Sequence, residues 1–257
     1  MKKAILIVSF GTKHLNTLNN TIGAIERYIQ EQFPNYRVYR AFTSEMIVSI
    51  LKNEYATEVC TLDEAMDQMH EDGVDQVIVQ PTYVVHSMAF LKLKEELKKY
   101  RGAFQKICLG EPLLNRPEDY KACVNAMIDE WKLTREEIIV IAGHGTRHYA
   151  QSAYTMLEYV FHLFGYTNVL VGTVRGFPDV NNVMEKLELL DRARVRIIPF
   201  MIVSGEHVMY DLSKGGTSWA SRFSKMGFPS EVESRGLGEM QGIRRIFAEH
   251  IREALES

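Results

Sequence analysis

The chain has 257 residues, 46% of them hydrophobic and 25% charged, which is typical of a protein with a full apolar core. Its formal net charge is -3 and it contains no basic tract, so the composition argues against a nucleic-acid groove or an anionic membrane surface as partner. A small molecule is the expected ligand.

In the first half, apolar runs alternate with segments of helical periodicity. One helix start is marked by a capping box, in which Thr61 is followed three residues later by Glu64. The pattern predicts strands over 5–8, 36–42, 77–80 and 105–109, and helices over 15–33, 44–52, 61–72 and 90–100.

The second half repeats this alternation and then adds two helices with a short strand between them. The predicted strands cover 138–142, 167–173, 194–200 and 230–233, and the predicted helices cover 149–164, 180–190, 208–225 and 239–255. Buried strands that alternate with amphipathic helices predict an α/β fold, in which each parallel sheet is covered by helices on both faces.

Two stretches of the chain occur twice in the same order. Residues 5–13 return as 139–147, and residues 77–85 are echoed by 195–203. Such a repeat predicts two similar half-domains. We place them at 1–118 and 119–257, with the last helix free to pack back on the first half. Because ligands of open parallel sheets bind beyond the carboxyl ends of the strands, the site is expected in the cleft between the halves.

One difference between the copies is chemical. His144, flanked by two glycines, stands where the first copy has Phe10. An imidazole exposed at a strand end can bind a metal or accept a proton. The alternative is a histidine that only hydrogen-bonds the turn. Since the first copy makes the same turn without histidine, a functional role is favoured; His148, at the following helix start, is as well explained by a solvent-facing position.

A second constellation follows another predicted strand. Glu206 and His207 lie where that strand leads into a helix, and a carboxylate beside a histidine can hold its tautomer or accept its proton. The alternative is an ordinary helix start capped by Ser204. The position of His207 on a loop that corresponds to the loop of His144 favours a shared site.

Aromatic and methionine side chains recur at the ends of the predicted strands. They could form the floor of a site for a flat, largely apolar ligand, or each could belong to the core. The set comprises Phe10, Tyr83, Met88, Phe90, Phe177, Met201 and Met209.

The three cysteines lack CxxC spacing, which predicts free thiols in a reducing cytoplasm rather than disulfides or a zinc cluster. No apolar stretch approaches the roughly 18 residues of a membrane-spanning helix. The apolar run at the start ends at Ser9 without a cleavage site, so we expect a first strand rather than a signal peptide, and a cytoplasmic protein.

Taken as a set, these residues resemble the anaerobic cobalt chelatases that load a metal into sirohydrochlorin on the way to cobalamin. The segments that carry the resemblance span the chain: 8–12, 40–44, 143–146, 205–207, 218–219 and 236–239. It implies a lyase with two similar α/β halves, no organic cofactor and a divalent metal as substrate, Co²⁺ first, with Fe²⁺ or Ni²⁺ as alternatives. It also implies homo-oligomers and a metal held by two histidines and a glutamate. The histidines would be His144 and His207, with His144 also accepting pyrrole protons.

This chain departs from the family pattern at the glutamate. Where the pattern reads Val-Gly-x-Val-Glu-x-Tyr-Pro, the chain has Arg175 in place of the acid. A guanidinium beside a dication is repulsive, so Arg175 either turns away or binds a substrate carboxylate. The loop after the third strand has also lost acidic groups and gained His86, which has no counterpart in the pattern. We expect substrate contacts from Phe10, Thr12, Tyr83, His86, Met88, Arg175 and Glu206.

Three functions remain open. The first is insertion of Co²⁺ into sirohydrochlorin. The second is a divergent family member that binds, transfers or demetallates haem or another metallo-tetrapyrrole, using Arg175 and His86 for the macrocycle. The third is a binding module for an unrelated small ligand, against which the paired histidines argue.

Overall fold

The computed structural model describes residues 1–191 and 194–256, except for the side chains of residues 206–208. The chain divides into two compact units. The first unit contains Met1–Asn115 and the C-terminal segment from Ile243 onward, and the second contains Arg116–Gly242. The last segment of the chain therefore belongs to the first unit.

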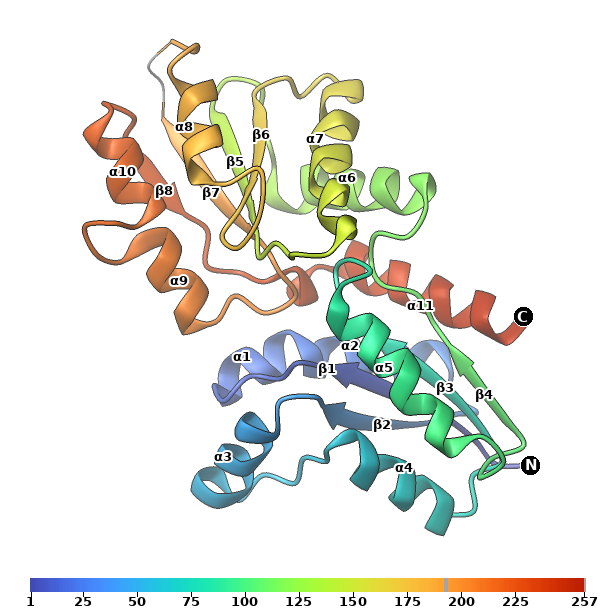
Figure 1. Ribbon diagram of the computed structural model, residues 1–257. Helices are drawn as coiled ribbons and strands as arrows, with labels where there is room; N and C mark the ends of the chain where they lie inside the picture. Colours follow the sequence, from blue (N-terminus) through green and yellow to red (C-terminus); the bar gives the residue numbers. More distant parts are fainter. Residues whose placement is uncertain (192–193, 257) are drawn as a thin grey trace. The chain divides into compact units, whose positions relative to one another are not determined.

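The first unit is built on a four-stranded parallel sheet of order β2-β1-β3-β4. Apolar side chains of β1 and β3 pack on one face against α4 and α5, while α2 and α11 cover the other face (Figure 1). The strands are β1 (Lys3–Ser9), β2 (Arg37–Phe42), β3 (Gln76–Pro81) and β4 (Lys106–Leu109). The helices are α1 (Leu15–Asn20), α2 (Ile22–Gln32), α3 (Glu45–Tyr55), α4 (Leu62–Glu71), α5 (Met88–Glu96), the 3₁₀ turn η1 (Leu97–Tyr100) and α11 (Gln241–Glu256).

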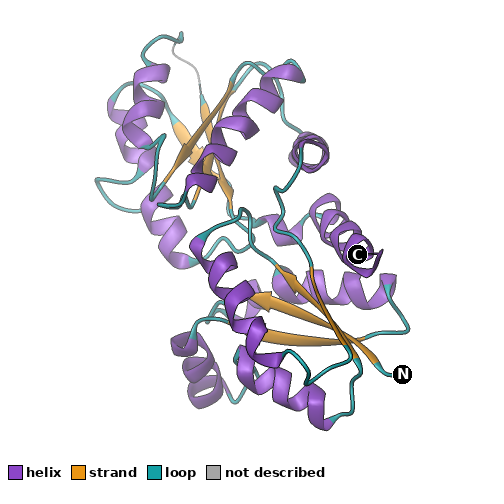
Figure 2. Ribbon diagram, turned by 45° about the vertical axis from the view of Figure 1, so that its right-hand side comes forward, coloured by secondary structure: helices purple, strands orange, loops and turns teal. Residues whose placement is uncertain are grey.

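The second unit has the same strand order, β6-β5-β7-β8, again all parallel. One face of its sheet packs on α8, α9 and α10, and α6 and α7 lie on the other (Figure 2). The strands are β5 (Ile138–Gly143), β6 (Val169–Thr173), β7 (Val195–Phe200) and β8 (Ser230–Val232). The helical segments are α6 (Pro117–Trp131), η2 (Tyr149–Gln151), α7 (Ser152–Leu163), α8 (Val180–Leu187), α9 (Glu206–Ser213), α10 (Trp219–Lys225) and η3 (Leu237–Glu239). The prediction of two similar α/β halves is confirmed.

Two predicted helices are each divided in the structure. The helix expected over 15–33 breaks at Thr21, whose hydroxyl donates to the Thr17 carbonyl at 2.6 Å, a side-chain bond that bends helices. The helix expected over 208–225 is interrupted between α9 and α10, where Gly215 adopts a φ of 88° that L-residues avoid.

The helix α6 is absent from the predicted elements. Its sequence signal is a proline at its first position, Pro117, followed by Glu118 and Asp119 in the first turn. The predicted capping box at α4 is confirmed, because the Glu64 amide donates to Thr61 Oγ1 at 3.3 Å and the Thr61 amide donates to Glu64 Oε2 at 2.9 Å.

The predicted free thiols are also confirmed, since Cys60, Cys108 and Cys123 form no disulfide. Complete burial raises the pKa of the Cys123 thiol, which keeps it protonated and unreactive. None of the helices in the described ranges is long and apolar enough to cross a membrane.

A partly buried ion-pair cluster ties β7 to the end of β8. Glu233 Oε2 lies 3.2 Å from Arg196 and 3.4 Å from Arg235. Burial acts to raise the pKa of Glu233, but the hydrogen bonds from Arg235 and Arg196 outweigh it and the pKa is lowered from 4.5. The cluster fixes the strand that leads to Glu206 and His207.

We expect Glu233→Gln to lower the free energy of unfolding by about 1–2 kcal/mol at pH 7, because it removes a charged acceptor from two guanidinium groups. Since the folded-state pKa of Glu233 is depressed, its contribution is complete above the ordinary glutamate pKa of 4.5 and is lost as the pH falls through the folded value. The difference between variant and wild type should therefore shrink below pH 4.5, as measured by urea denaturation.

The matched control is Glu231→Gln on the same strand. Glu231 pairs with Arg194 at the surface, and such exposed pairs contribute about 0–1 kcal/mol. Equal losses in the two variants at pH 7 would contradict the assigned role of Glu233.

Candidate functional site

Beyond β1 and β2 the backbone pairing of the first unit continues for two residues. The Thr43 amide donates to the Ser9 carbonyl at 2.9 Å, and the Ser44 amide donates to the Phe10 carbonyl at 3.3 Å. Gly11 follows with a φ of 99°, and a Cβ there would lie 2.6 Å from the ring of Phe42. Only glycine fits this turn, which leaves Phe10 exposed at the carboxyl edge of the sheet.

The second unit repeats this frame beyond β5 and β6. The Val174 amide donates to the Gly143 carbonyl at 2.9 Å, and the Arg175 amide donates to the His144 carbonyl at 2.8 Å. Gly145 has a φ of 83°, and a Cβ there would approach the Arg175 backbone to 2.9 Å. The backbones of His144 and Arg175 are therefore neighbours, as those of Phe10 and Ser44 are in the first unit.

The threonine of each turn has an internal role. The His14 amide donates to Thr12 Oγ1 at 3.3 Å, and the His148 amide donates to Thr146 Oγ1 at 3.2 Å. Thr12 is buried, so the structure assigns its hydroxyl to the turn. Its contact with a substrate stays a prediction.

The imidazole of His144 is oriented by its own loop. Nδ1 lies 3.0 Å from the Gly145 carbonyl oxygen, which can only accept, so the proton resides on Nδ1. The lone pair of Nε2 is then available, and the residue is exposed. A backbone bond at one ring nitrogen is the usual support of a histidine that binds a metal or a proton through the other.

Gln151 is a supporting residue that the sequence analysis missed. Its Oε1 accepts from the Thr146 amide at 2.6 Å, and its Nε2 donates to Thr173 Oγ1 at 3.0 Å and to the Phe177 carbonyl at 2.7 Å. One amide side chain thus holds the loop of His144 to the loop of Arg175. No local pattern marks it, because its partners lie up to 26 residues away.

The Arg175 side chain is 69% exposed, and its Nη2 lies 3.9 Å from Asp211 Oδ2 on α9. Asp211 comes four residues after His207 in the chain, within α9. The predicted site residues Glu206 and His207 begin this helix, but their side chains lie outside the described part of the structure. Asp211 adds a carboxylate that the sequence analysis did not select.

The predicted row of apolar side chains is split by the structure. Phe90 and Met201 are buried and belong to the core. Phe10, Met88 and Phe177 are 64%, 61% and 71% exposed. Their exposure leaves these three side chains accessible to a ligand.

Tyr83 is mostly buried, and this burial raises its pKa, against the opposing effect of the Thr43 hydroxyl. His86 is partly exposed in the loop between β3 and α5, beside Glu111 and Asn115. Neither of these two partners was selected from the sequence.

The described residues include no group of three or more histidine, cysteine, aspartate or glutamate side chains that could hold a metal. Among these described residues, His144 therefore belongs to no such group. A metal site that uses His207 would include a side chain that the structure does not describe.

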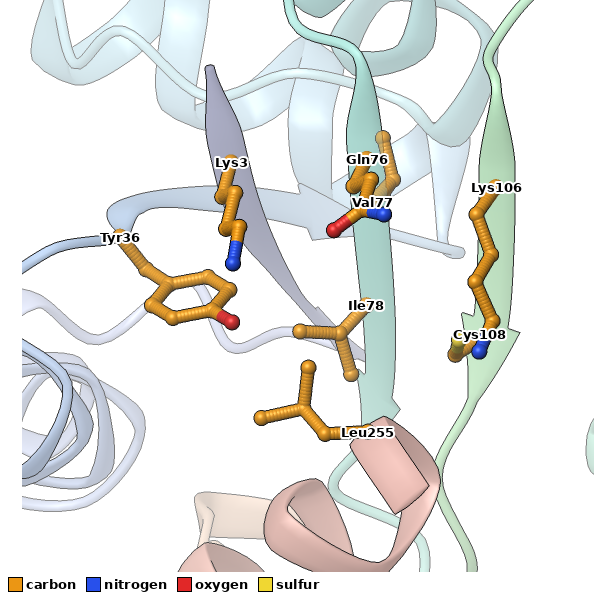
Figure 3. A pocket seen from close by; sticks show the side chains of 8 residues that line it. All are labelled: Lys3, Tyr36, Gln76, Val77, Ile78, Lys106, Cys108 and Leu255. Atoms are coloured by element: carbon orange, nitrogen blue, oxygen red, sulfur yellow. The ribbon is translucent and has the colours of Figure 1, made fainter. Parts of the chain in front are cut away.

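A cavity of about 290 Å³ lies at the opposite, amino-terminal edge of the first unit's sheet. Lys3, Gln76 and Lys106 begin three neighbouring strands and share one register row, and Leu255 of α11 closes the space below them (Figure 3). Ligands of open parallel sheets bind at the carboxyl edge. We therefore assign the functional site to the loops that follow the carboxyl ends of the strands and not to this cavity.

Comparison with known proteins identifies the family of the chain. Residues 3–256 match the family of cobalt chelatases named CbiK. The chain is 32% identical to the sirohydrochlorin cobaltochelatase of Salmonella typhimurium, with 99% of this chain and 97% of that protein covered. It is 26% identical to the sirohydrochlorin cobaltochelatase CbiKC of Nitratidesulfovibrio vulgaris, with 100% and 92% covered.

Solved structures share the fold at low sequence identity. The chelatase SirB of Bacillus subtilis with Fe³⁺ superposes with a TM-score of 0.72 at 16% identity, covering 99% of this chain and 96% of that one. The cobalt complex of SirB from Bacillus subtilis subspecies spizizenii gives a TM-score of 0.69 at 14% identity, covering 100% and 96%. The predicted resemblance is confirmed over the whole chain, which belongs to the cobalt chelatase (CbiK) family.

Proposed function

We propose that the protein inserts Co²⁺ into sirohydrochlorin, with release of the two pyrrole protons. The observation that carries the proposal is the oriented imidazole of His144, whose Nε2 lone pair is presented at the carboxyl edge of the sheet in a chain that belongs to this chelatase family. The relatives from Salmonella typhimurium and Nitratidesulfovibrio vulgaris are both named sirohydrochlorin cobaltochelatases, which supports this substrate and this metal.

In this proposal His144 and His207 hold the metal before insertion. Neutral imidazole suits Co²⁺, and His144 can accept a pyrrole proton once the metal has left it. Glu206 stands next to His207 in the chain, and we assign it to support of that histidine or to contact with the substrate. Co²⁺ is a substrate here, and no organic cofactor takes part; Fe²⁺ and Ni²⁺ are the alternative metals.

We assign Arg175 to a carboxylate of the macrocycle. Sirohydrochlorin carries eight carboxylates, and a guanidinium forms bidentate bonds with such groups. The Arg175 amide is bonded to the His144 carbonyl, so the guanidinium starts close to the proposed metal-binding imidazole. We also assign Phe10, Met88 and Phe177, whose side chains are exposed, to apolar contact with the substrate. Tyr83 and Thr12 stay predicted substrate contacts.

We further propose a cytoplasmic homo-oligomer without a nucleic-acid partner. Three free cysteines suit a reducing compartment, and a net charge of -3 is unfavourable for binding nucleic acid. The assignment to a homo-oligomer rests on the family resemblance.

Arg175 also supports a second candidate function. A permanent cation at the place of the glutamate weakens the case for binding free Co²⁺ and favours a ligand that already carries its metal, such as haem or another metallo-tetrapyrrole. Binding, transfer or demetallation of such a ligand would use Arg175 and His86 for the macrocycle.

The first test is insertion itself. Wild-type protein should convert the visible spectrum of sirohydrochlorin with Co²⁺ much faster than buffer, and His144→Ala should lower the rate by at least about 100-fold, because the imidazole that holds metal and proton is gone. His70→Ala, at the end of α4, is the control. The second candidate would be favoured by two results together. The wild type would be no faster than buffer with Co²⁺, Fe²⁺ or Ni²⁺, and the Soret band would shift when haem is added.

The second test addresses Arg175. Arg175→Glu restores an anionic ligand beside His144 and should increase Co²⁺ affinity at least tenfold, about 1.4 kcal/mol, in a titration without macrocycle. The same change should weaken sirohydrochlorin binding, because a carboxylate would face the carboxylates of the ring. Arg175→Gln removes the cation without adding an anion; if it gains as much Co²⁺ affinity as Arg175→Glu, the carboxylate is not a ligand.

A further inference from the structure

The loop that carries His86 is already held by the backbone. Residues 82–87 join β3 to α5, and the Leu113 and Leu114 amides donate to the Tyr83 and Val84 carbonyls at 2.8 and 2.9 Å. The segment after β4 therefore lies along this loop without help from the imidazole. The imidazole of His86 would therefore add little to the stability of the loop, which these backbone hydrogen bonds already hold.

The imidazole of His86 is nevertheless fixed on three sides. Nε2 lies 2.9 Å from Asn115 Oδ1 and 3.3 Å from Glu111 Oε2, and the ring meets Phe90 edge to face with centroids 4.8 Å apart. The side chain keeps 30% of its surface exposed. Ordering an exposed side chain in this way costs conformational entropy, and a structural role that the backbone already fills does not account for that cost.

These contacts determine the tautomer of His86. Nε2 hydrogen-bonds Asn115 Oδ1, an amide oxygen that can only accept, so Nε2 carries the proton. The lone pair is then on Nδ1. Among the residues that the structure describes, none hydrogen-bonds Nδ1.

The neighbouring carboxylate has unused capacity. Oε2 of Glu111 is buried, and no described residue donates a well-aligned hydrogen bond to it. A buried carboxylate oxygen without a donor is unfavourable, and a positive charge on the imidazole 3.3 Å away would compensate it. Glu111 therefore has an acceptor oxygen available to an imidazolium at this distance.

Apolar surface flanks the imidazole at the carboxyl edge of the first unit. The loops after β1 and β3 are joined by the Thr82 amide, which donates to the Val8 carbonyl at 2.8 Å, and by the 2.8 Å bond between the Ser9 and Thr82 hydroxyls. Phe10 on the first loop and Met88 after the second are both exposed. A flat ring covering them would lie at the edge where Nδ1 is available.

We propose that His86, held by Glu111 and Asn115, accepts one of the two pyrrole protons during metal insertion. This inference rests on the proposed function and deepens it. The pyrrole N–H bond breaks, its electron pair stays on nitrogen to bind the metal, and the proton moves to Nδ1 to form an imidazolium that faces the Glu111 carboxylate. His86 is the catalytic residue, and Glu111 and Asn115 are positioning residues.

The experiment measures single-turnover insertion of Co²⁺ into sirohydrochlorin by His86→Gln in the full chain. Glutamine can keep the hydrogen bond to Asn115 but cannot accept the proton, so the rate constant should fall at least tenfold while the Kd for metal-free sirohydrochlorin stays within about twofold. Glu111→Gln should lower the rate constant by a smaller factor with the same unchanged Kd. Added imidazole should restore part of the rate to His86→Gly.

The control is His70→Gln in the same unit, whose ring also meets a phenylalanine, Phe104, edge to face but at the amino-terminal edge. It should match wild type in rate and Kd. If wild type inserts Co²⁺ and His86→Gln is equally fast, or if His86→Gln only weakens sirohydrochlorin binding, the inference about His86 is wrong and the proposed function stands. If wild type itself is no faster than buffer, the proposed function fails, and the role of His86 fails with it.

Discussion

The site depends on the second backbone hydrogen bond beyond each pair of strands. In the first unit it joins the Ser44 amide to the Phe10 carbonyl, and in the second it joins the Arg175 amide to the His144 carbonyl. A glycine of positive φ must follow, because a Cβ would collide with the next segment. The backbone therefore holds the same two positions together in both units, and only the side chains decide whether the edge carries chemistry.

This constraint limits what Arg175 can do. Its backbone cannot withdraw from His144 without breaking the frame, so only the guanidinium can turn aside, and it lies 3.9 Å from Asp211. An exposed ion pair at this distance is weak and screened, so it does not commit the arginine to Asp211. A substrate carboxylate can take the place of Asp211 at small cost, which agrees with a role for Arg175 in binding the macrocycle.

The fold could be predicted where one local pattern determines it. The strands were predicted because each is a short buried apolar run, and the repeat indicated the second sheet from the first. The break at Thr21 depends on one hydrogen bond of its hydroxyl group. The apolar periodicity continues through this residue, so the pattern did not predict the break. Gln151 and Glu111 were missed for another reason: their importance arises from contacts with segments more than 20 residues away, which no local spacing encodes.

The two oriented imidazoles differ in tautomer, and the difference follows from their supports. A backbone carbonyl holds the proton of His144 on Nδ1, whereas Asn115 and Glu111 hold that of His86 on Nε2. Inserting a dication into a neutral ring releases two protons, and one imidazole accepts only one of them. His144 is also the proposed metal ligand, so its lone pair is occupied until the metal leaves. A second base that holds no metal removes this conflict, because its lone pair is not occupied by the ion.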